Sequence, residues 1–210
     1  MSVSEYCIVD RILDIPFQRA GQGLMMGGYK TSHNDNEVEH ALIYQGLIDH
    51  PKETINLRIN SACYTSDIFG CQRCDCSWQL DQAIDYIQKN NGLIIYHFHH
   101  EGRGFGFTNK LKSFEIMKKE RKTSWDACVE LHSKDDQRSY LSTIKILHDL
   151  GIKNINLLSN NPEKKAILEA HDINVHDIIP IVNQDLELRE YLKIKRDKLG
   201  HFISFEGSDE

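Results

Sequence analysis

The chain has 210 residues, of which 40% are hydrophobic and 27% charged, proportions that are ordinary for a globular protein able to bury its own core. Its formal net charge of -6 argues against sequence-independent binding of nucleic acid, which requires a basic surface. The sequence contains no apolar run of roughly 18 residues that would span a membrane, and its start does not follow the pattern of a signal peptide. We therefore expect one compact cytoplasmic domain over residues 1–210, with no nucleic-acid or membrane partner.

Short apolar runs bounded by Gly, Asn, Asp and Pro make up the first part of the chain, a pattern typical of antiparallel strands. The expected strands cover residues 5–14, where Pro16 ends the run, and then 21–29, 41–45 and 55–59. We expect these four strands to follow one another as a meander.

After residue 76 the apolar residues recur with the period of amphipathic helices, and short apolar strands alternate with them. The expected helices cover 78–90, a segment from Thr108, 140–150, a segment opened by Asn161 and Pro162, and 186–199. The expected strands cover 93–96, 155–158 and 173–179, whereas residues 118–135 are polar and carry no clear assignment. The fold class is therefore α+β, with a β-rich N-terminal part followed by alternating α and β elements.

Four of the six cysteines, Cys63, Cys71, Cys74 and Cys76, lie close together after the fourth expected strand. Thiolates are soft ligands, and three or four of them in one loop predict a zinc site. Catalytic zinc keeps three protein ligands, and the Cys74-Asp75-Cys76 spacing is tighter than the pair of a common structural finger. We expect Cys63, Cys74 and Cys76 to bind zinc, with Cys71 outside the ligand set. A closed four-cysteine structural site is the alternative, and a disulfide framework is not expected in a cytosolic chain of this size.

Two strand-to-helix turns are candidate phosphate sites. In the turn Glu101-Gly102-Arg103-Gly104-Phe105-Gly106, glycines let a ligand approach the backbone and the planar guanidinium suits phosphate oxygens. In the segment from Ser159 to Lys164, a lysine in the first helical turn opposes the helix dipole, which a phosphate partner would explain. The alternatives are a solvated arginine in the first turn and an ordinary surface lysine in the second.

Histidines and one Asp/Arg pair are further candidates. If the strand continues through them, His97 and His99 face one way and His100 the other. One of them could complete a mixed Cys/His zinc site, although packed or solvated histidines are the commoner outcome. Asp136 and Arg138 do not share a helix face, but both can point into one cleft from a loop. A capping aspartate followed by an exposed arginine is the alternative.

These motifs, in this order, resemble those of the GTP cyclohydrolase II family. The family's R-x-H-S-E-C and D-x-F-G-S-x-R-C-D-C-G-x-Q-L strings correspond to residues 58–63 and 67–80. Its blocks E-G-R-G-x-G-x-x-N-K, D-x-R-x-[YF], L-L-T-N-N-P-x-K and Y-L-x-x-K-x-x-K-x-G-H correspond to residues 101–110, 136–140, 157–164 and 191–201. The resemblance covers nearly the whole chain and implies the family's fold and a homodimer. The length leaves no room for the dihydroxybutanone phosphate synthase domain that is often fused to this family.

The resemblance also implies an activity and residue roles. The family hydrolyses GTP, opening the imidazole ring at C8 with release of formate and pyrophosphate, to give a diaminopyrimidine ribosyl phosphate of the riboflavin pathway. One zinc ion per subunit would be held by Cys63, Cys74 and Cys76, and Mg²⁺ would bridge the substrate phosphates. Arg138 would attack the α-phosphorus, and Asp136 would accept its proton. The expected substrate contacts are Arg58, Asn60, Gln79, Glu101, Gly102, Arg103, Thr123, Ser159 and Lys164.

The sequence departs from the family's pattern near the expected zinc ion. Asn60 and Ala62 replace the His and Glu of R-x-H-S-E-C, and Phe114 stands where a tyrosine is usual. His99-His100 stands where Arg-Gln is usual, and the shifted D-T-x-E-A-N segment leaves Thr123 or Ser124 to contact the nucleotide. Two alternatives to the family's reaction therefore stay open. One is a paralogue that acts on another purine or pyrimidine nucleotide or stops at a formylated product, and the other is a non-catalytic, zinc-stabilised nucleotide-binding module.

Overall fold

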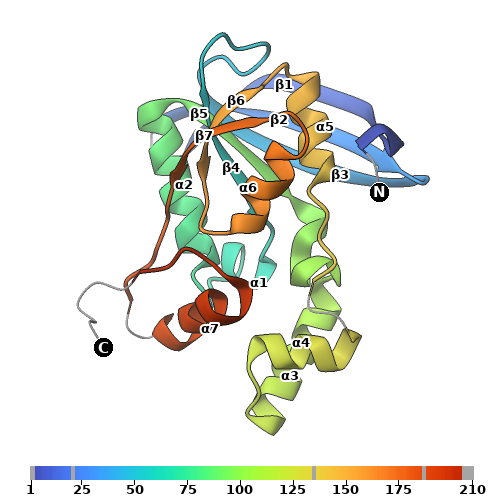
Figure 1. Ribbon diagram of the computed structural model, residues 1–210, viewed down its shortest axis with the longest axis vertical. Helices are drawn as coiled ribbons and strands as arrows, with labels where there is room; N and C mark the ends of the chain where they lie inside the picture. Colours follow the sequence, from blue (N-terminus) through green and yellow to red (C-terminus); the bar gives the residue numbers. More distant parts are fainter. Residues whose placement is uncertain (1–2, 20–21, 134–135, 186–187, 205–210) are drawn as a thin grey trace.

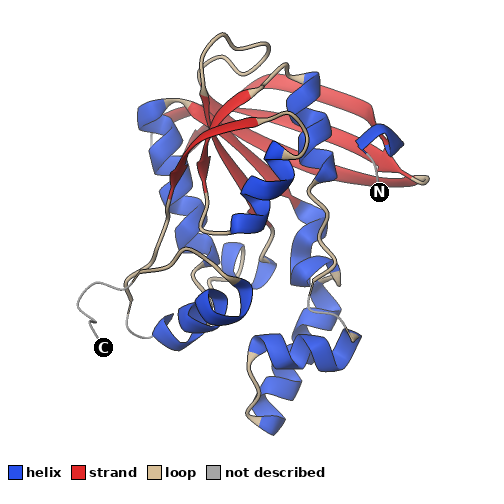
Figure 2. Ribbon diagram, in the orientation of Figure 1, coloured by secondary structure: helices blue, strands red, loops and turns tan. Residues whose placement is uncertain are grey.

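The computed structural model describes residues 3–19, 22–133, 136–185 and 188–204 of the chain (Figures 1 and 2). The described residues form one mixed seven-stranded sheet with the strand order β1-β2-β3-β5-β4-β6-β7, and helices pack on it. This arrangement confirms the α+β class and the β-rich beginning.

The strands are β1 (Tyr6–Arg19), β2 (Gln22–His33), β3 (Asn36–Gln45), β4 (Ile55–Ser61), β5 (Gly92–His97), β6 (Asn154–Leu158) and β7 (Asn174–Ile179). The helices are α1 (Tyr64–Asp67), α2 (Cys76–Asn90), α3 (Phe107–Glu120), α4 (Ser124–His132), α5 (Leu141–Asp149), α6 (Pro162–Glu169) and α7 (Arg189–Leu199). Two 3₁₀ helices, η1 (Val3–Glu5) and η2 (Phe98–Gly104), complete the described elements.

The first three strands form antiparallel hairpins, as expected. β2 and β3 are joined at Asn34 and Asp35, whose positive φ angles of 48° and 60° suit a two-residue hairpin turn. The expectation that Pro16 ends the first strand is wrong, because β1 continues to Arg19 with Pro16 paired to Met25. Proline is tolerated there because β1 is the edge of the sheet, where a strand can lack an amide hydrogen without losing a ladder bond.

The expected meander ends after β3. β4 does not pair with β3 but lies parallel to β5 and β6, and β5 takes the place beside β3. The reason is the crossover through α2, which returns the chain parallel to β4 and makes a β-α-β unit. β4, β5 and β6 therefore all end at the same edge of the sheet.

Helices cover the central strands on both faces, which makes three layers. Leu93 and Ile95 of β5 belong to the core that includes residues of α5 and α6, while Ile94 between them packs with residues of α2. All six residues of β5 are consequently buried, so the strand reads in the sequence as a continuous apolar run.

Residues 118–135, unassigned from the sequence, contain the end of α3 and all of α4, and residues 134–135 lie outside the described part. α4 begins with a capping box in which Thr123 and Asp126 each bind the other's backbone N–H. The helix expected over 186–199 is α7, which begins at Arg189, and residues 186–187 lie outside the described part. Among the described residues, every helix is too short or too polar to cross a membrane.

Candidate active site

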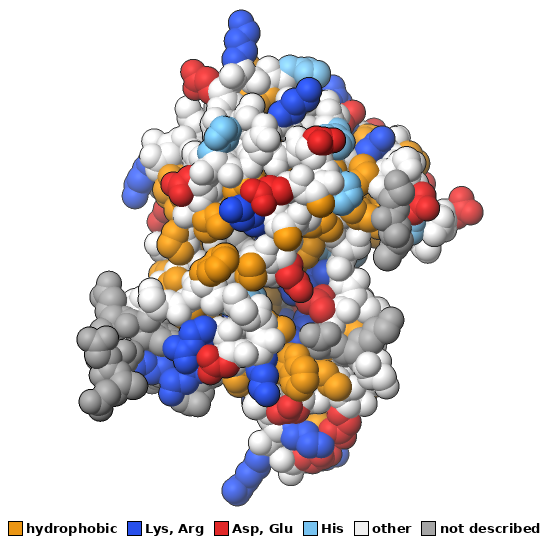
Figure 3. Space-filling model, viewed as in Figure 1, with side chains coloured by type: hydrophobic (Ala, Val, Ile, Leu, Met, Phe, Trp, Pro, Cys, Tyr) orange, Lys and Arg blue, Asp and Glu red, His pale blue; other side chains and the backbone are white. Residues whose placement is uncertain are grey.

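A cleft of about 240 Å³ lies beyond the carboxyl ends of β4, β5 and β6. Such ends are where open sheets with parallel strands usually bind ligands. Residues of α3 and α4 line one side of the cleft and residues of α7 line another, and these helices extend away from the sheet on opposite sides in Figure 1. The space-filling view shows an indentation at this level, with Lys and Arg side chains gathered over α7 (Figure 3).

Three thiols meet on one wall of the cleft. Cys63 follows β4 and caps α1, Cys74 precedes α2, and Cys76 is the first residue of α2. The three Sγ atoms all lie within 4.8 Å of one another, and those of Cys63 and Cys74 are 3.7 Å apart. Tetrahedral zinc with Zn–S bonds of about 2.3 Å holds its sulfurs about 3.8 Å apart, so the three thiols fit a zinc ion. Cys71 lines the cleft but lies outside this group.

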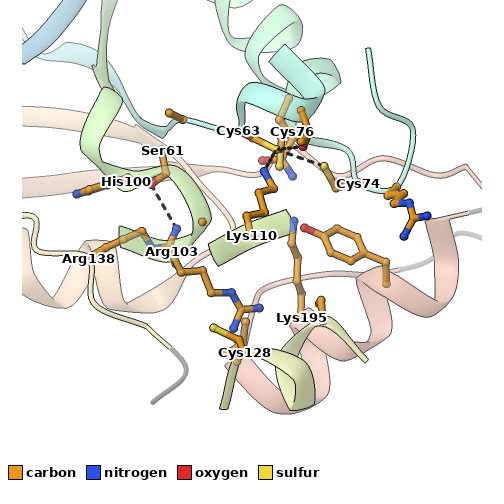
Figure 4. Close-up of a pocket in the computed structure, with 18 of the residues that line it drawn as sticks. Ser61, Cys63, Cys74, Cys76, His100, Arg103, Lys110, Cys128, Arg138 and Lys195 are labelled. Carbon is orange, nitrogen blue, oxygen red and sulfur yellow. Dashed lines mark hydrogen bonds between the residues drawn. The ribbon is translucent and has the colours of Figure 1, made fainter. Parts of the chain in front are cut away.

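A lysine that the sequence did not single out lies beside the thiols. The Lys110 ammonium donates to Cys63 Sγ at 2.9 Å (Figure 4). It also forms an ion pair with Glu101 at 2.8 Å. Glu101 is buried and does not line the cleft, because its carboxylate also accepts from the backbone N–H groups of Tyr64 and Gly102. Hydrogen bonds from the other two thiols, and then Lys110, lower the pKa of Cys63 well below that of an ordinary thiol. The thiolate, which is the metal-binding form, is therefore favoured.

Two buried cations face the cleft without a carboxylate partner among the described residues. Arg58 is 6% exposed and donates to Asn60, Gln79 and the carbonyl of Leu158. Lys164 is 7% exposed and donates to the carbonyl of Ile59 at 2.7 Å, so it is not the ordinary surface lysine of the alternative interpretation. Burial, and then the charges of Arg58 and Arg138, lower the pKa of Lys164. Buried charges without counterions are costly, and an anionic ligand would offset that cost.

The Asp136/Arg138 pair is held against the glycine turn. Gly104 has φ +86°, and a Cβ there would lie 3.2 Å from the backbone of Gln137, so glycine allows the two segments to meet. The Arg138 Nε donates to both carboxylate oxygens of Asp136, at 2.9 and 3.0 Å, and Nη1 donates to Ser61 Oγ at 3.3 Å. Arg138 lines the cleft, whereas Asp136 supports it from behind.

The prediction that His97 and His100 face opposite ways is wrong. The strand ends at His97 and the chain enters η2, so the His97 and His100 rings stack with centroids 4.4 Å apart. His100 lines the cleft and joins the chemistry through Ser61, whose Oγ lies 3.0 Å from His100 Nδ1. Two-residue alternation fails here because a 3₁₀ turn advances three residues per turn.

Helix α7 contributes residues to the cleft whose position there could not be predicted from the sequence. Lys195 forms an ion pair at 2.9 Å with Asp75, whose side chain is fully buried, and Tyr191 and His201 also line the cleft. The motif over residues 191–201 signalled this segment, but not its position. Asp75 also accepts from Gln79, which in turn accepts from Arg58, so one network links α7 to the buried arginine.

Most of the expected substrate contacts line the cleft together with the thiols. They are Arg58, Asn60, Gln79, Gly102, Arg103, Ser159 and Lys164. Thr123 does not line it, because its hydroxyl is used in the cap of α4, whereas the neighbouring Ser124 does. Ser124 is therefore the better placed of the two to contact a nucleotide. Phe114 also lines the cleft, under the guanidinium of Arg73 at 5.1 Å from the ring centroid.

Three thiols beside buried cations, at the carboxyl edge of a mixed sheet, form a candidate site for a metal ion and an anionic ligand. The family model for GTP cyclohydrolase II matches residues 11–180. The chain therefore belongs to the GTP cyclohydrolase II family, a family of hydrolases, as its motifs predicted.

Curated relatives agree with this assignment. Riboflavin biosynthesis protein RibBA of Cytophaga hutchinsonii is 41% identical over 152 residues, covering 72% of this chain and 37% of the relative. The proteins of that name from Nocardia farcinica and Staphylococcus saprophyticus are 36% and 38% identical, covering 83% and 85% of this chain and 42% and 44% of theirs. The chain thus spans less than half the length of these relatives.

Among solved structures, RibBX of A. baumannii, described as a two-domain 3,4-dihydroxy-2-butanone 4-phosphate synthase, matches with a TM-score of 0.45 at 10% identity. The match covers 86% of this chain and 41% of that chain. At this TM-score the likeness carries no argument about function.

Proposed function

We propose that the chain is a zinc-dependent GTP cyclohydrolase II that opens the imidazole ring of GTP and releases formate and pyrophosphate. The product would be a diaminopyrimidine ribosyl phosphate, which matches the riboflavin biosynthesis in the names of the relatives. The observation that carries the proposal is the meeting of the thiol trio with the unpaired buried cations in one cleft. The first suits a metal and the second a polyphosphate.

Cys63, Cys74 and Cys76 would hold the zinc ion, one in each subunit. Bound there, zinc would supply a Lewis acid that activates water for attack on the purine ring. The chain's own contribution is to keep Cys63 ionised and fixed: the other two thiols and Lys110 lower its pKa, and Glu101 holds Lys110 in place. Three protein ligands would suit a catalytic zinc ion rather than a closed structural one.

Arg58, Lys164 and Arg138 would bind the phosphates, and Mg²⁺ would accompany the nucleotide and help to neutralise its charge. Arg138 is the nucleophile in this proposal: one of its nitrogens bonds to the α-phosphorus, pyrophosphate leaves and Asp136 takes the proton. Water then cleaves the phosphorus–nitrogen bond, which releases the ribosyl phosphate and restores Arg138. Support comes from the Nε contacts with Asp136, which orient the guanidinium plane and keep an acceptor beside it. A non-catalytic module would have no use for a pair held this way.

The test is mass spectrometry of what the zinc-loaded protein makes from GTP and Mg²⁺, with formate and pyrophosphate counted separately. Equal amounts of both support the full reaction. Pyrophosphate without formate would mean that the reaction stalls before the formyl group is released, at the altered surroundings, Asn60, Ala62 and Phe114. Neither product would overturn GTP as the substrate, and the paralogue interpretation would then be tested with other purine and pyrimidine nucleotides.

Two variants separate the two halves of the reaction. Cys74→Ser should abolish formate release, because it removes a zinc ligand. Arg138→Lys keeps the positive charge but loses the planar contact with Asp136, so pyrophosphate release should fall roughly 100-fold, as expected when a reacting group is misplaced. Lys165→Gln, at a half-exposed position on α6 that does not line the cleft, is the matched control and should leave both rates unchanged.

A further inference from the structure

Three histidines meet behind the cleft, in a place that the proposed reaction does not use. His40 of β3 and His97 of β5 are directly opposite each other in the antiparallel ladder, and their Nδ1 atoms are 3.0 Å apart. His99 of η2 completes the group, and one ring nitrogen of each histidine lies within 4.8 Å of the other two. None of the three lines the cleft, so the group is separate from the thiol trio.

Two buried threonines hold the outer side of this group. Thr31 Oγ1 lies 2.9 Å from His40 Nε2, and Thr143 Oγ1 lies 2.7 Å from His97 Nε2. When both Nε2–H groups donate to these hydroxyls, both Nδ1 atoms present lone pairs to the same point. A cation between them relieves that repulsion, and outer hydrogen bonds of this kind usually orient histidines that bind metals.

His99 supplies the second, independent observation. Its Nδ1 is buried and has no hydrogen-bond partner among the described residues, although buried ring nitrogens normally have one. A proton shared between His40 and His97 would satisfy those two rings but leave this nitrogen without a partner. We infer that His40, His97 and His99 form a second metal site, which takes a first-row transition-metal dication such as Zn²⁺.

The chemistry of the site agrees with this class of ligand. Three imidazoles and no carboxylate favour zinc, copper or nickel over calcium or magnesium. Neutral imidazole is the form of histidine that binds metals. A metal there would tie β3 and β5 to η2, the element that carries the cleft residue His100.

The test counts metal per chain after loading with Zn²⁺ and extensive dialysis. We expect two zinc ions per wild-type chain and one in Cys74→Ser/Cys76→Ser, where the thiol site is lost. His99→Phe should lower the count to one in the wild-type background and to none in the cysteine background. His176→Gln, an exposed histidine of β7, controls for loose binding by surface imidazoles and should change neither count.

Cobalt substitution keeps the test decisive if the cysteine variant does not fold. In the wild type, cobalt at the thiol site gives thiolate-to-metal charge-transfer absorption, and His99→Phe should retain this band while losing half of the bound cobalt. One metal ion per wild-type chain, or two in His99→Phe, would overturn the inference. The inference would also be overturned if His99→Phe lost the charge-transfer band, because the ion lost would then be the one at the thiol site.

Discussion

Lys164 lies in the first turn of α6 and, unlike a surface lysine, is buried. Its ammonium donates to the carbonyl of Ile59 and lies 5.5 Å from the centroid of the Tyr140 ring. Burial, and then the positive charges of Arg58 and Arg138, lower its pKa below the ordinary value of 10.5. In the free protein this shift makes folding more favourable as the pH rises through the window between the lowered and the ordinary pKa, because the unfolded chain holds the proton more tightly.

A bound phosphate should reverse the shift in the pKa of Lys164. We expect nucleotide binding to take up a proton in that pH window, measurable by titration calorimetry in buffers of different ionisation enthalpy. Lys164→Met should abolish the uptake and weaken binding by about 2 kcal/mol, or roughly 30-fold. Lys165→Met should do neither. Unchanged proton uptake in Lys164→Met would show that another group is responsible.

Phe114 tests whether ring opening runs to completion. Tyrosine at this position keeps the ring under Arg73 and adds a hydroxyl to the cleft wall. If the protein stops at a formylated product, Phe114→Tyr should raise the rate of formate release on the order of 100-fold, the lower end of what a positioned proton donor contributes. The readout is the ratio of formate to pyrophosphate. The same ratio in wild type, Phe114→Tyr and the control Phe107→Tyr would remove this role of the missing phenol.

At the scale of elements, α7 is held to the site by a buried ion pair. Lys195 is the charge partner of the fully buried Asp75, and removing one member of such a pair leaves the other charge uncompensated. Lys195→Met should therefore lower the free energy of unfolding by about 3 kcal/mol in urea titrations. Lys193→Met, on the same helix, should cost far less, and adding Asp75→Asn to Lys195→Met should recover part of the loss. Equal effects of the two lysine variants would contradict this account.

His201, which follows α7, should make the stability of the protein sensitive to acid. Burial, and then the charges of Lys195 and Lys164, lower the pKa of His201 to about 3 from 6.5. The stability contributed by this neutral ring is present above pH 6.5 and is lost as the pH falls toward 3, because the unfolded chain binds the proton first. The free energy of unfolding should fall less steeply over this range in His201→Gln than in the wild type, as measured by urea titrations at a series of pH values. The same pH dependence in both proteins would contradict this role of His201.

Local sequence patterns predicted where strands and helices lie along the chain better than they predicted which strands pair with each other. The existence of β4 followed from its apolar run, but its pairing with β5 depends on the path of α2, which no local pattern specifies. The N-terminus of α4 was in principle readable, since Thr123 and Asp126 have the spacing of a capping box. The turn into η2 was not, and it overturned the alternation of the histidines.

In the candidate site, too, residues that are close in sequence were easier to predict than residues that are far apart. The thiol trio lies within 14 residues of sequence and could be proposed from spacing and ligand chemistry, because its members are nearly neighbours. Lys195 lies 120 residues from Asp75, and nothing near either residue indicates that they meet. Lys110 stands in a motif that was recognised, but its contact with Cys63 depends on how α3 leaves the glycine turn.

At the scale of the whole molecule, β1 is an edge strand with an apolar surface. Val9, Ile12 and Ile15 are 46%, 58% and 46% exposed, and exposed apolar side chains that gather on one element often mark an interface. We propose that the chain is a homodimer that uses this strand. Light scattering coupled to gel filtration should give twice the chain mass for the wild type and the chain mass for Ile12→Asp. Leu111→Asp, an equally apolar exposed position on α3, should stay dimeric, and a monomeric wild type would refute the dimer.

The placement of α7 also bears on synthesis. Tyr191, Lys195, Leu199 and His201 all follow the described strands in the sequence, so every described strand is synthesised before these residues of the cleft. The lysine that pairs with Asp75 comes 120 residues after it. A ligand can therefore contact the complete cleft only once the chain has been synthesised as far as His201.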